Sequence, residues 1–458
     1  MIESVAGGKG FAMNATLLKL WERLQSSFWF LPSLMALGSG LLAIALVMLD
    51  EAWGNAWLAT QPWARGWMYG GDADGASDVL GIIAGSMIAI AGVVFSMTLV
   101  ALSLASSQFG PRLLRNFMRD RVNQAVLGTF IATFLYSLLV LRSIRHVGDA
   151  AFVPHIAVSV SVMFALLSLG VFIYFIHHVA VSIQGNEIVA RVASELMDCI
   201  DSLAVDERSS SDSRGHGGRE ACAAGQAGSD GEPGQILCHT DGYLQIIDSD
   251  TLLALAVRTD TVLEVVCRAG HYAIRDTPIV RVWPSDAVDS ALEREVREAF
   301  AFGNQRTSAQ DMEFPLDQLV EVAVRALSPG INDPFTAINC VDRLGSALAR
   351  LAAIELASPD RCDESGVRRV LIPAFRFPAM LDAACNPIRQ CAQSSAPVSI
   401  RLLEVLQVIA AAASTEKNRR AVGRQARMIA HGVCDGLLEE NDRSAVEERL
   451  QAVLGAVA

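Results

Sequence analysis

Serine hydroxyls and very small residues recur at helical spacing in an apolar stretch, "GIIAGSMIAIAGVVFSMTLVALSLASSQFG", residues 81–110. On a helix that turns 100° per residue, its small residues share an arc of roughly 80°. Such a stripe allows helices to pack closely in a membrane. Around an axis shared by several copies, its hydroxyls could instead line a path for ions or water. The candidates for helix packing or pore lining are Gly85, Ala89, Gly92, Ser96, Ser103 and Ser107.

Two arginines follow this stripe where its polarity increases. Arg112 and Arg115 are candidates for a cytoplasmic vestibule that would favour anions. Arginines in a short loop are also the ordinary signal for the cytoplasmic side of a membrane. The interiors of the apolar stretches contain no Asp, Glu, Lys or Arg, which disfavours ion-coupled transport.

A second polar group occurs in "ALSPGINDP", residues 326–334. Arg325, Ser328, Asn332 and Asp333 are candidates for a ligand pocket at the N-terminus of the following helix, where anions are attracted. Asp333 would repel an anion, however, and a tight turn between two helices accounts for the same residues. The turn is the favoured interpretation.

The remaining polar residues form no catalytic or metal-binding pattern that we identify. The chain has no G-x-S-x-G and no H-E-x-x-H motif, and no lysine lies between Lys19 and Lys417. His177 and His178 are adjacent, so on a helix they diverge by about 100° and are poorly placed to share a metal. We expect them to hydrogen-bond lipid headgroups or a neighbouring helix. We expect no enzymatic activity, no cofactor and no metal.

Four uncharged apolar stretches position these residues, at 27–49, 79–110, 122–141 and 152–178. Each is long enough to cross a hydrocarbon core of about 30 Å as a helix. The first is too long for a signal-peptide core, so we expect a retained span. Arginines in the second loop favour a cytoplasmic location for that loop. We therefore expect a multi-pass membrane protein with both termini in the cytoplasm.

The charge of the chain limits its partners. Residues 1–180 carry a net charge of +1 (10 Lys and Arg, 9 Asp and Glu), and the rest carries −13 (27 against 40). An acidic C-terminal part argues against nucleic acid as a partner. All nine cysteines lie at or beyond Cys199 without paired C-x-x-C spacing, as expected of reduced thiols in the cytosol.

The pattern predicts a membrane protein with four transmembrane α-helices followed by a cytoplasmic α+β region. That region comprises a small β barrel-sandwich-like module and a helical domain. Short β-type runs separated by Asp and Gly predict the β module. Asp333 and Pro334 predict the cap and first residue of a helix, and further helical segments fit 366–394, 398–413 and 417–456. The expected parts are an N-terminal segment 1–26, a transmembrane domain 27–180, a helical extension of the fourth span 181–205, a flexible linker 206–234, a β module 235–286 and a helical domain 287–458.

Three segments carry a resemblance to a known family. They are "VVFSMTLVALSLASSQFGPRLLRNFMRDR", "FIHHVAVSIQ" and "RTSAQDMEFPLDQLVEVAVRALSPGINDPFTA". Together they resemble a family of predicted bacterial membrane proteins, domain of unknown function 2254. The chain departs from the family pattern at Pro315, where glycine is usual, and at Glu321, where aspartate is usual. The resemblance implies an inner-membrane protein with four spans and a cytoplasmic C-terminal region, and it implies no activity.

Two functions are consistent with these features. The first is an oligomeric passive channel for ions or small solutes, lined by the second span and regulated by the cytoplasmic region. The alternative is a membrane-anchored sensor or scaffold that conducts nothing and binds a small molecule or a protein through its cytoplasmic domains. The small, hydroxylated stripe and the uncharged interiors of the spans favour the channel. The expected partners are the lipid bilayer, further copies of the chain and a cytoplasmic ligand.

Overall fold

The computed structural model of this chain describes residues 29–60, 69–109, 120–145, 152–182, 185–212, 231–354, 356, 358–434, 436 and 439–458. The chain divides into two compact units, Met1–Gln184 and Gly185–Ala458. We call them the membrane unit and the C-terminal unit.

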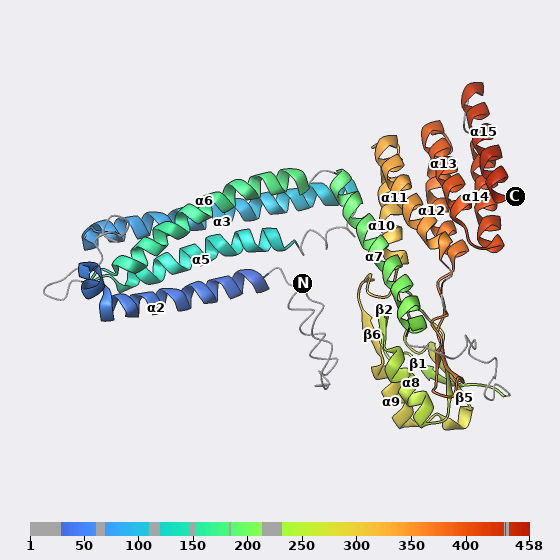
Figure 1. Cartoon of the computed structure of the whole chain (residues 1–458), viewed down its shortest axis with the longest axis horizontal. Coiled ribbons are helices and arrows are strands. Elements are labelled where there is room, and N and C mark those ends of the chain that lie inside the picture. Colours follow the sequence, from blue (N-terminus) through green and yellow to red (C-terminus); the bar gives the residue numbers. More distant parts are fainter. Residues whose placement is uncertain are drawn as a thin grey trace. The chain divides into compact units, whose positions relative to one another are not determined.

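The membrane unit consists of long apolar helices (Figure 1). They are α2 (Phe30–Thr60), α3 (Ala73–Phe109), α5 (Arg121–Ser143) and α6 (His155–Ser182). Each contains a stretch that is long and apolar enough to cross a membrane: Phe30–Ala52, Ala73–Leu104, Arg121–Ser143 and His155–Val181. The four predicted spans are therefore confirmed as candidate membrane helices.

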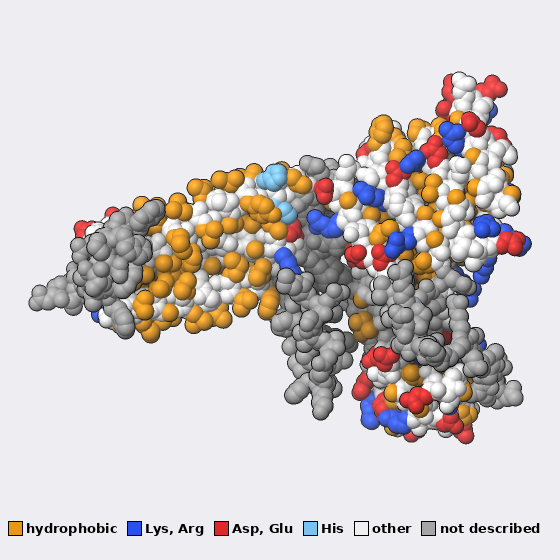
Figure 2. Space-filling model, viewed as in Figure 1, with side chains coloured by type: hydrophobic (Ala, Val, Ile, Leu, Met, Phe, Trp, Pro, Cys, Tyr) orange, Lys and Arg blue, Asp and Glu red, His pale blue; other side chains and the backbone are white. Residues whose placement is uncertain are grey.

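Helix α5 is the centre of the membrane unit, because it packs against α2, α3 and α6. Half of its apolar stretch is buried, against 17–22% for the other three helices. Hydrophobic side chains cover the outer surface of this unit (Figure 2). That distribution suits helices whose outer faces contact lipid rather than water.

Polar side chains join α5 to α6. The hydroxyls of Ser137 and Ser161 lie 2.7 Å apart in the buried interface. Such bonds between hydroxyls hold helices together where no hydrophobic driving force acts. At one end, Asp120 caps α5 and its other carboxylate oxygen lies 2.7 Å from Nε2 of His178. The prediction that an interfacial histidine bonds a neighbouring helix is confirmed for His178.

The C-terminal unit begins with α7 (Gly185–Asp212). One continuous helix was predicted to leave the membrane; α6 is described to Ser182 and α7 from Gly185, and residues 183–184, on which its continuity depends, lie outside the described residues. Helix α7 also continues to Asp212, beyond the predicted end at 205. Residues 213–230 of the predicted linker lie outside the described residues.

Two sheets follow α7. Their strands are β1 (Gly234–Leu237), β2 (Gly242–Ile247), β3 (Val262–Val265), β4 (Tyr272–Ala273), β5 (Pro278–Trp283), β6 (Phe300–Gly303), β7 (Arg361–Cys362) and β8 (Arg368–Leu371). One sheet has the order β1-β5-β3-β8-β7, and the other has the order β4-β2-β6. Only β3 and β8 pair in parallel; the other described pairs are antiparallel.

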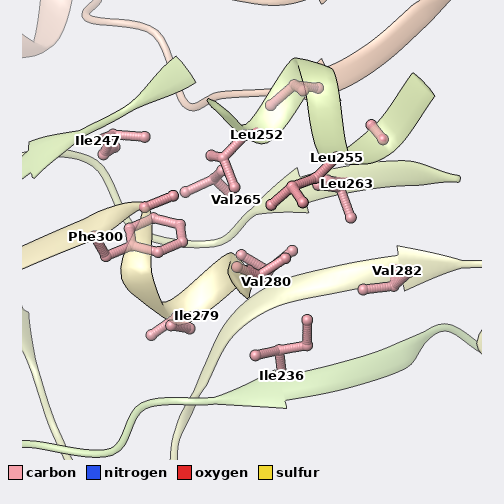
Figure 3. Close-up of a cluster of buried hydrophobic side chains, with 14 of the residues drawn as sticks. Ile236, Ile247, Leu252, Leu255, Leu263, Val265, Ile279, Val280, Val282 and Phe300 are labelled. Carbon is pink, nitrogen blue, oxygen red and sulfur yellow. The ribbon is translucent and has the colours of Figure 1, made fainter. Parts of the chain in front are cut away.

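Helices α8 (Ser249–Arg258) and α9 (Ser290–Glu298) complete this region, with a short 3₁₀ helix at Ser285–Ala287. Leu252 and Leu255 of α8 lie among buried side chains of β3 and β5 (Figure 3). Asp248 caps α8 by accepting a hydrogen bond from the Thr251 amide. The predicted barrel-sandwich is not confirmed: a helix interrupts its strands, and the sheets include strands from 300–303 and 361–371.

The helices beyond the sheets form two packed rows. They are α10 (Glu313–Ala326), α11 (Pro334–Ala353), α12 (Phe377–Cys391), α13 (Ala396–Ala412), α14 (Glu416–Cys434) and α15 (Glu440–Val457). Helices α7, α11, α13 and α15 pack in one row, and α10, α12 and α14 in the other. Asp333 caps α11 and Pro334 begins it, as predicted. The segment predicted at 366–394 contains β8 as well as α12, and the one at 417–456 is two helices.

The cysteines depart from expectation at one position. Six are free thiols, among them the buried Cys340 and Cys385. Cys362, in β7, is disulfide-bonded. The expectation that every cysteine is a reduced thiol is therefore wrong for Cys362.

Candidate functional site

A cavity of about 280 Å³ opens within the C-terminal unit. Five segments form it: α7, the end of β2 with the start of α8, residues 268–269 after β3, the loop 306–312 before α10, and the segment 356–375 around β7 and β8. Cavities of about 300–1,000 Å³ hold drug-sized ligands. This cavity therefore suits a smaller molecule.

The loop 306–312 is fixed by a buried ion-pair network. Arg306 donates to both carboxylate oxygens of Asp311, at 2.7 and 3.1 Å, and to Asp317 at 2.6 Å. The Asp311 side chain is only 1% exposed. Burial raises the pKa of Asp317, and the Arg306 guanidinium opposes that rise. Both oxygens of Asp311 accept hydrogen bonds from Arg306, so the charge of this carboxylate is balanced within the protein.

The same loop is tied to the neighbouring elements. The side chain of Gln310 accepts a bond from the Ile247 amide at 2.9 Å and donates to the Ile247 carbonyl at 3.1 Å, as an adjoining strand would. Ser308 donates to Glu195 of α7, and the Cys199 thiol contacts the Ser308 carbonyl at 3.6 Å. The wall of the cavity is therefore held from two sides.

Two arginines supply positive charge at the cavity. Arg268 donates to Glu313 at 2.6 Å, and its guanidinium carbon lies 4.6 Å from the centre of the Phe375 ring. Its Nη1 atom is buried and has no hydrogen-bond partner among the described residues. Arg361 is exposed and donates to the Pro359 carbonyl at 3.2 Å.

Most other lining residues are apolar, including Ile247, Met312, Leu356 and Ile372. The one cysteine in the lining is Cys199. Burial and neighbouring carboxylates raise the pKa of its thiol to about 11. At neutral pH this thiol is protonated, and the thiolate is the nucleophilic form. The arrangement is that of an apolar binding cavity with arginines at its wall.

The small-residue stripe lies on the outer side of α3. Gly85, Ala89, Gly92, Ser96 and Ser103 are all exposed in the single chain. A Cβ added at Gly85 or Gly92 would meet nothing within 4 Å. Helix α3 instead packs on α5 and α6 through another face, which carries Met87, Ala91 and Val94. The stripe is therefore not used for packing within the described part of this chain.

Three of the predicted residues on or next to the stripe are not described. Arg112 and Arg115 lie outside the described residues, and the side chain of Ser107 is likewise outside the description.

The polar residues of the turn before α11 engage local groups. Asp333 accepts bonds from the amides of Phe335 and Thr336, both at 3.1 Å. Ser328 donates to the Arg325 carbonyl at 2.7 Å, and Arg325 itself pairs with Glu321. Asn332 adopts a left-handed backbone conformation with φ of 51°. The turn brings these four residues together as the sequence suggests, but none of them lines the cavity.

Sequence reasoning did not find the cavity. Its loop lies in "RTSAQDMEFPLD", residues 306–317, which carries part of the family resemblance and was not predicted as a site. The spacing of Arg306, Asp311 and Asp317 is a local signal of a buried network. The opposite wall, 356–375, offers no such signal because chain topology alone brings it close.

The chain has apolar membrane helices followed by a mixed helical and sheet unit that contains a small cavity. These features define a class of membrane protein with a large extramembrane part. The chain belongs to the family described as predicted membrane proteins, DUF2254, whose model matches residues 25–408. The match includes all four candidate spans and every segment that forms the cavity.

The family has curated relatives in mycobacteria. Uncharacterized proteins of Mycobacterium tuberculosis (strain ATCC 25618 / H37Rv) and Mycobacterium bovis (strain ATCC BAA-935 / AF2122/97) are each 32% identical to this chain over 431 residues. The alignment covers 93% of this chain and 80% of either relative. No solved structure matches the chain significantly.

Proposed function

We propose that this protein is a membrane-anchored receptor that binds a small organic anion in the cavity of its C-terminal unit. The observation that carries the proposal is the cavity itself, whose wall is built from the ion-paired loop 306–312. Because this loop is held by several ion pairs and hydrogen bonds, the cavity is pre-formed. A pre-formed cavity binds a ligand without a large loss of conformational entropy.

The lining favours an anion with an apolar body. The charged residues described in it are Arg268, Arg361 and Asp311. Asp311 is paired with Arg306, and Arg268 with Glu313, both outside the lining, so the remaining positive charge is that of Arg361. The rest of the wall is mainly apolar. A carboxylate would accept bonds from an arginine, while a flat hydrocarbon portion would contact Phe375 and its neighbours.

Benzoate is a probe of this class that fits the cavity, and benzamide is its neutral counterpart of nearly equal shape. A molecule of nine heavy atoms gains roughly 0.3–0.5 kcal/mol per heavy atom, which gives a dissociation constant of about 0.5–10 mM. Ligand-observed NMR, by saturation transfer from the full-length protein in nanodiscs, measures binding in this range.

Filling the cavity tests the site. Ala309 lines the cavity and is exposed, so Ala309→Phe places a ring in the ligand's space without disturbing a buried residue. Ala411→Phe, at an exposed position of α13 away from the cavity, is the matched control. We expect Ala309→Phe to abolish benzoate saturation transfer and Ala411→Phe to leave it unchanged. Equal transfer in both variants, or none in the native chain, contradicts the proposal.

In this proposal the cavity binds and does not catalyse, and no cofactor or metal is involved. We propose a bacterial inner membrane as its location, as the family suggests, with both termini in the cytoplasm, because the arginines of the second loop favour that side. The cavity would then sample cytoplasmic solutes. Its partners are the bilayer and the cytoplasmic ligand, and nucleic acid is disfavoured by the acidic C-terminal part.

A second candidate function is passive conduction by an oligomer, with α3 lining the path. The observation in its favour is that the stripe faces out of the membrane unit and meets no other part of the described chain. A further copy can therefore approach it closely. In this scheme the ligand cavity would regulate the path.

Ser103→Leu tests this second candidate, with Ser86→Leu as control, because Ser86 is exposed on the same helix but lies about 100° around it from Ser103. Conduction predicts that Ser103→Leu reduces either ion flux into liposomes or oligomer size, and that Ser86→Leu changes neither. If Ser103→Leu leaves both unchanged, the stripe has neither role.

A further inference from the structure

The turn between α10 and α11 exposes two large apolar side chains. Phe335 is 81% exposed and Ile331 is 49% exposed, and Phe335 has the highest exposure of any large hydrophobic residue described. A solvent-exposed phenylalanine does not contribute the favourable free energy that comes from removing its apolar surface from water. Exposed apolar groups of this kind often mark a contact surface.

The turn holds these side chains in a fixed conformation. The Asp333 amide donates to the Ala326 carbonyl at 2.7 Å, and the Ile331 and Asn332 amides donate to the Ser328 carbonyl at 3.0 and 2.9 Å. The Asp333 carboxylate also caps α11. The exposure of Phe335 is therefore a property of an ordered turn.

Helices α7 and α11 run parallel to each other, and their contacts locate the turn. Asn339 donates to Asn186 at 2.8 Å near the starts of the two helices, and Arg350 donates to Asp201 further along both. Phe335 lies about one helical turn before Asn339. Phe335 therefore lies at the same end of the C-terminal unit as the start of α7, which the chain enters from the residues before Gly185.

Those preceding residues belong to the last membrane helix. The candidate span in α6 ends at Val181, and α7 begins at Gly185. Four residues of chain span at most about 15 Å even when fully extended. The start of α7, and the turn beside it, is therefore tethered near the membrane surface by the chain itself.

We propose that Phe335 and Ile331 insert into the interfacial region of the bilayer on the side where α6 ends. The proposal is independent of the ligand cavity. Phenylalanine and large aliphatic side chains on surface segments bury at the boundary between lipid headgroups and acyl chains. The covalent tether raises the local concentration of the turn at that surface, so a weak apolar contact suffices.

The contact is apolar rather than electrostatic. The chain beyond residue 180 carries a net charge of −13, which would not attract it to anionic lipid. Insertion should therefore be insensitive to salt, because screening weakens only charge interactions.

Photo-crosslinking tests the proposal in the full-length protein. Phe335→p-benzoylphenylalanine places a photoreactive ring of similar shape at the turn, and Val408→p-benzoylphenylalanine is the control at a 62% exposed position on α13. Both variants are irradiated in nanodiscs of phosphatidylglycerol and phosphatidylcholine, and the adducts are identified by mass spectrometry.

We expect lipid adducts at position 335 to exceed those at position 408 at least fivefold, at both low and high salt. Equal lipid labelling at the two positions would overturn the proposal. Adducts at position 335 that join two copies of the chain, or join it to another protein, in place of lipid would also overturn it and would identify the alternative occupant.

Discussion

Replacing Arg306 by methionine should destabilise the C-terminal unit strongly. Arg306 is 18% exposed and is the cation bonded to Asp311, which is 1% exposed. Arg306→Met leaves that carboxylate buried without its cation. Breaking a buried ion pair from one side typically costs about 3–5 kcal/mol. We therefore expect a loss of about 4 kcal/mol, with the cavity loop 306–312 losing its conformation.

Hydrogen exchange measured by mass spectrometry follows this loss in full-length protein, because it reports the free energy of opening for individual segments. Peptides from α10 should exchange much faster in Arg306→Met. Arg401→Met is the matched control, since Arg401 also pairs with two carboxylates but is 41% exposed. Exposed pairs contribute about 0.2–1 kcal/mol.

The double variant Arg306→Met/Asp311→Asn separates lost charge pairing from lost packing. It removes the unpaired buried charge, so it should recover roughly half of the lost free energy. If Arg306→Met costs less than 1 kcal/mol, or if the double variant is less stable than the single one, the network does not hold the cavity loop as argued.

Three further predictions concern single positions. Asp333→Ala should cost α11 about 1 kcal/mol of stability at pH 7. Hydrogen bonds from Thr336 lower the pKa of Asp333 below 3.8, so the stability difference between the native chain and the variant is present above pH 3.8 and is lost as the pH falls further. Hydrogen exchange of α11 measured against pH checks this. Gly270→Ala should cost about 2–3 kcal/mol in a thermal unfolding assay, because φ is 92° and the new Cβ would overlap the buried Asp311 carboxylate. Gly366→Ala, with φ of 81° and open space around the new Cβ, should cost about 1 kcal/mol. Maleimide at neutral pH should modify the exposed Cys391 and leave Cys385 unmodified in the folded protein, because burial raises the Cys385 pKa to about 12; rapid labelling of Cys385 would contradict its position in the core.

The helices were largely predictable from the sequence because their signals are local. Uncharged runs of about 20 residues identified the four spans, and Asp333 with Pro334 marked the start of α11. These signals rest on hydrogen bonds and burial within one segment, so no knowledge of the tertiary structure is required.

The sheets were predicted less well because strand pairing is not local. "DTLLALAVR", residues 250–258, lies between two β-type runs and forms α8, where Leu252 contributes to the core. Strand β3 pairs with β8, more than a hundred residues later in the chain. A reading of 235–286 alone as a closed module could not include that partner.

The cavity was not predictable for the same reason. Its lining comes from several segments that are far apart in the chain, and among them only 306–312 contains a recognisable pattern. The stripe on α3 was visible in the sequence, but the sequence could not show which face of α3 packs on α5. The structure shows that Met87 and Val94 occupy that face and that Ser96 does not.

The measurement that tests the central claim most directly is the ratio of benzamide to benzoate dissociation constants for the full-length protein in nanodiscs. A charge-assisted bond from a partly exposed arginine is worth about 1.4 kcal/mol, which is tenfold in affinity. We therefore predict that the native protein binds benzoate about tenfold more tightly than benzamide, and that Arg361→Gln reduces this ratio while benzamide binding is unchanged. Equal affinities of the native protein for the two compounds would contradict the assignment of this cavity to an organic anion, and the absence of binding by either would contradict the receptor function itself.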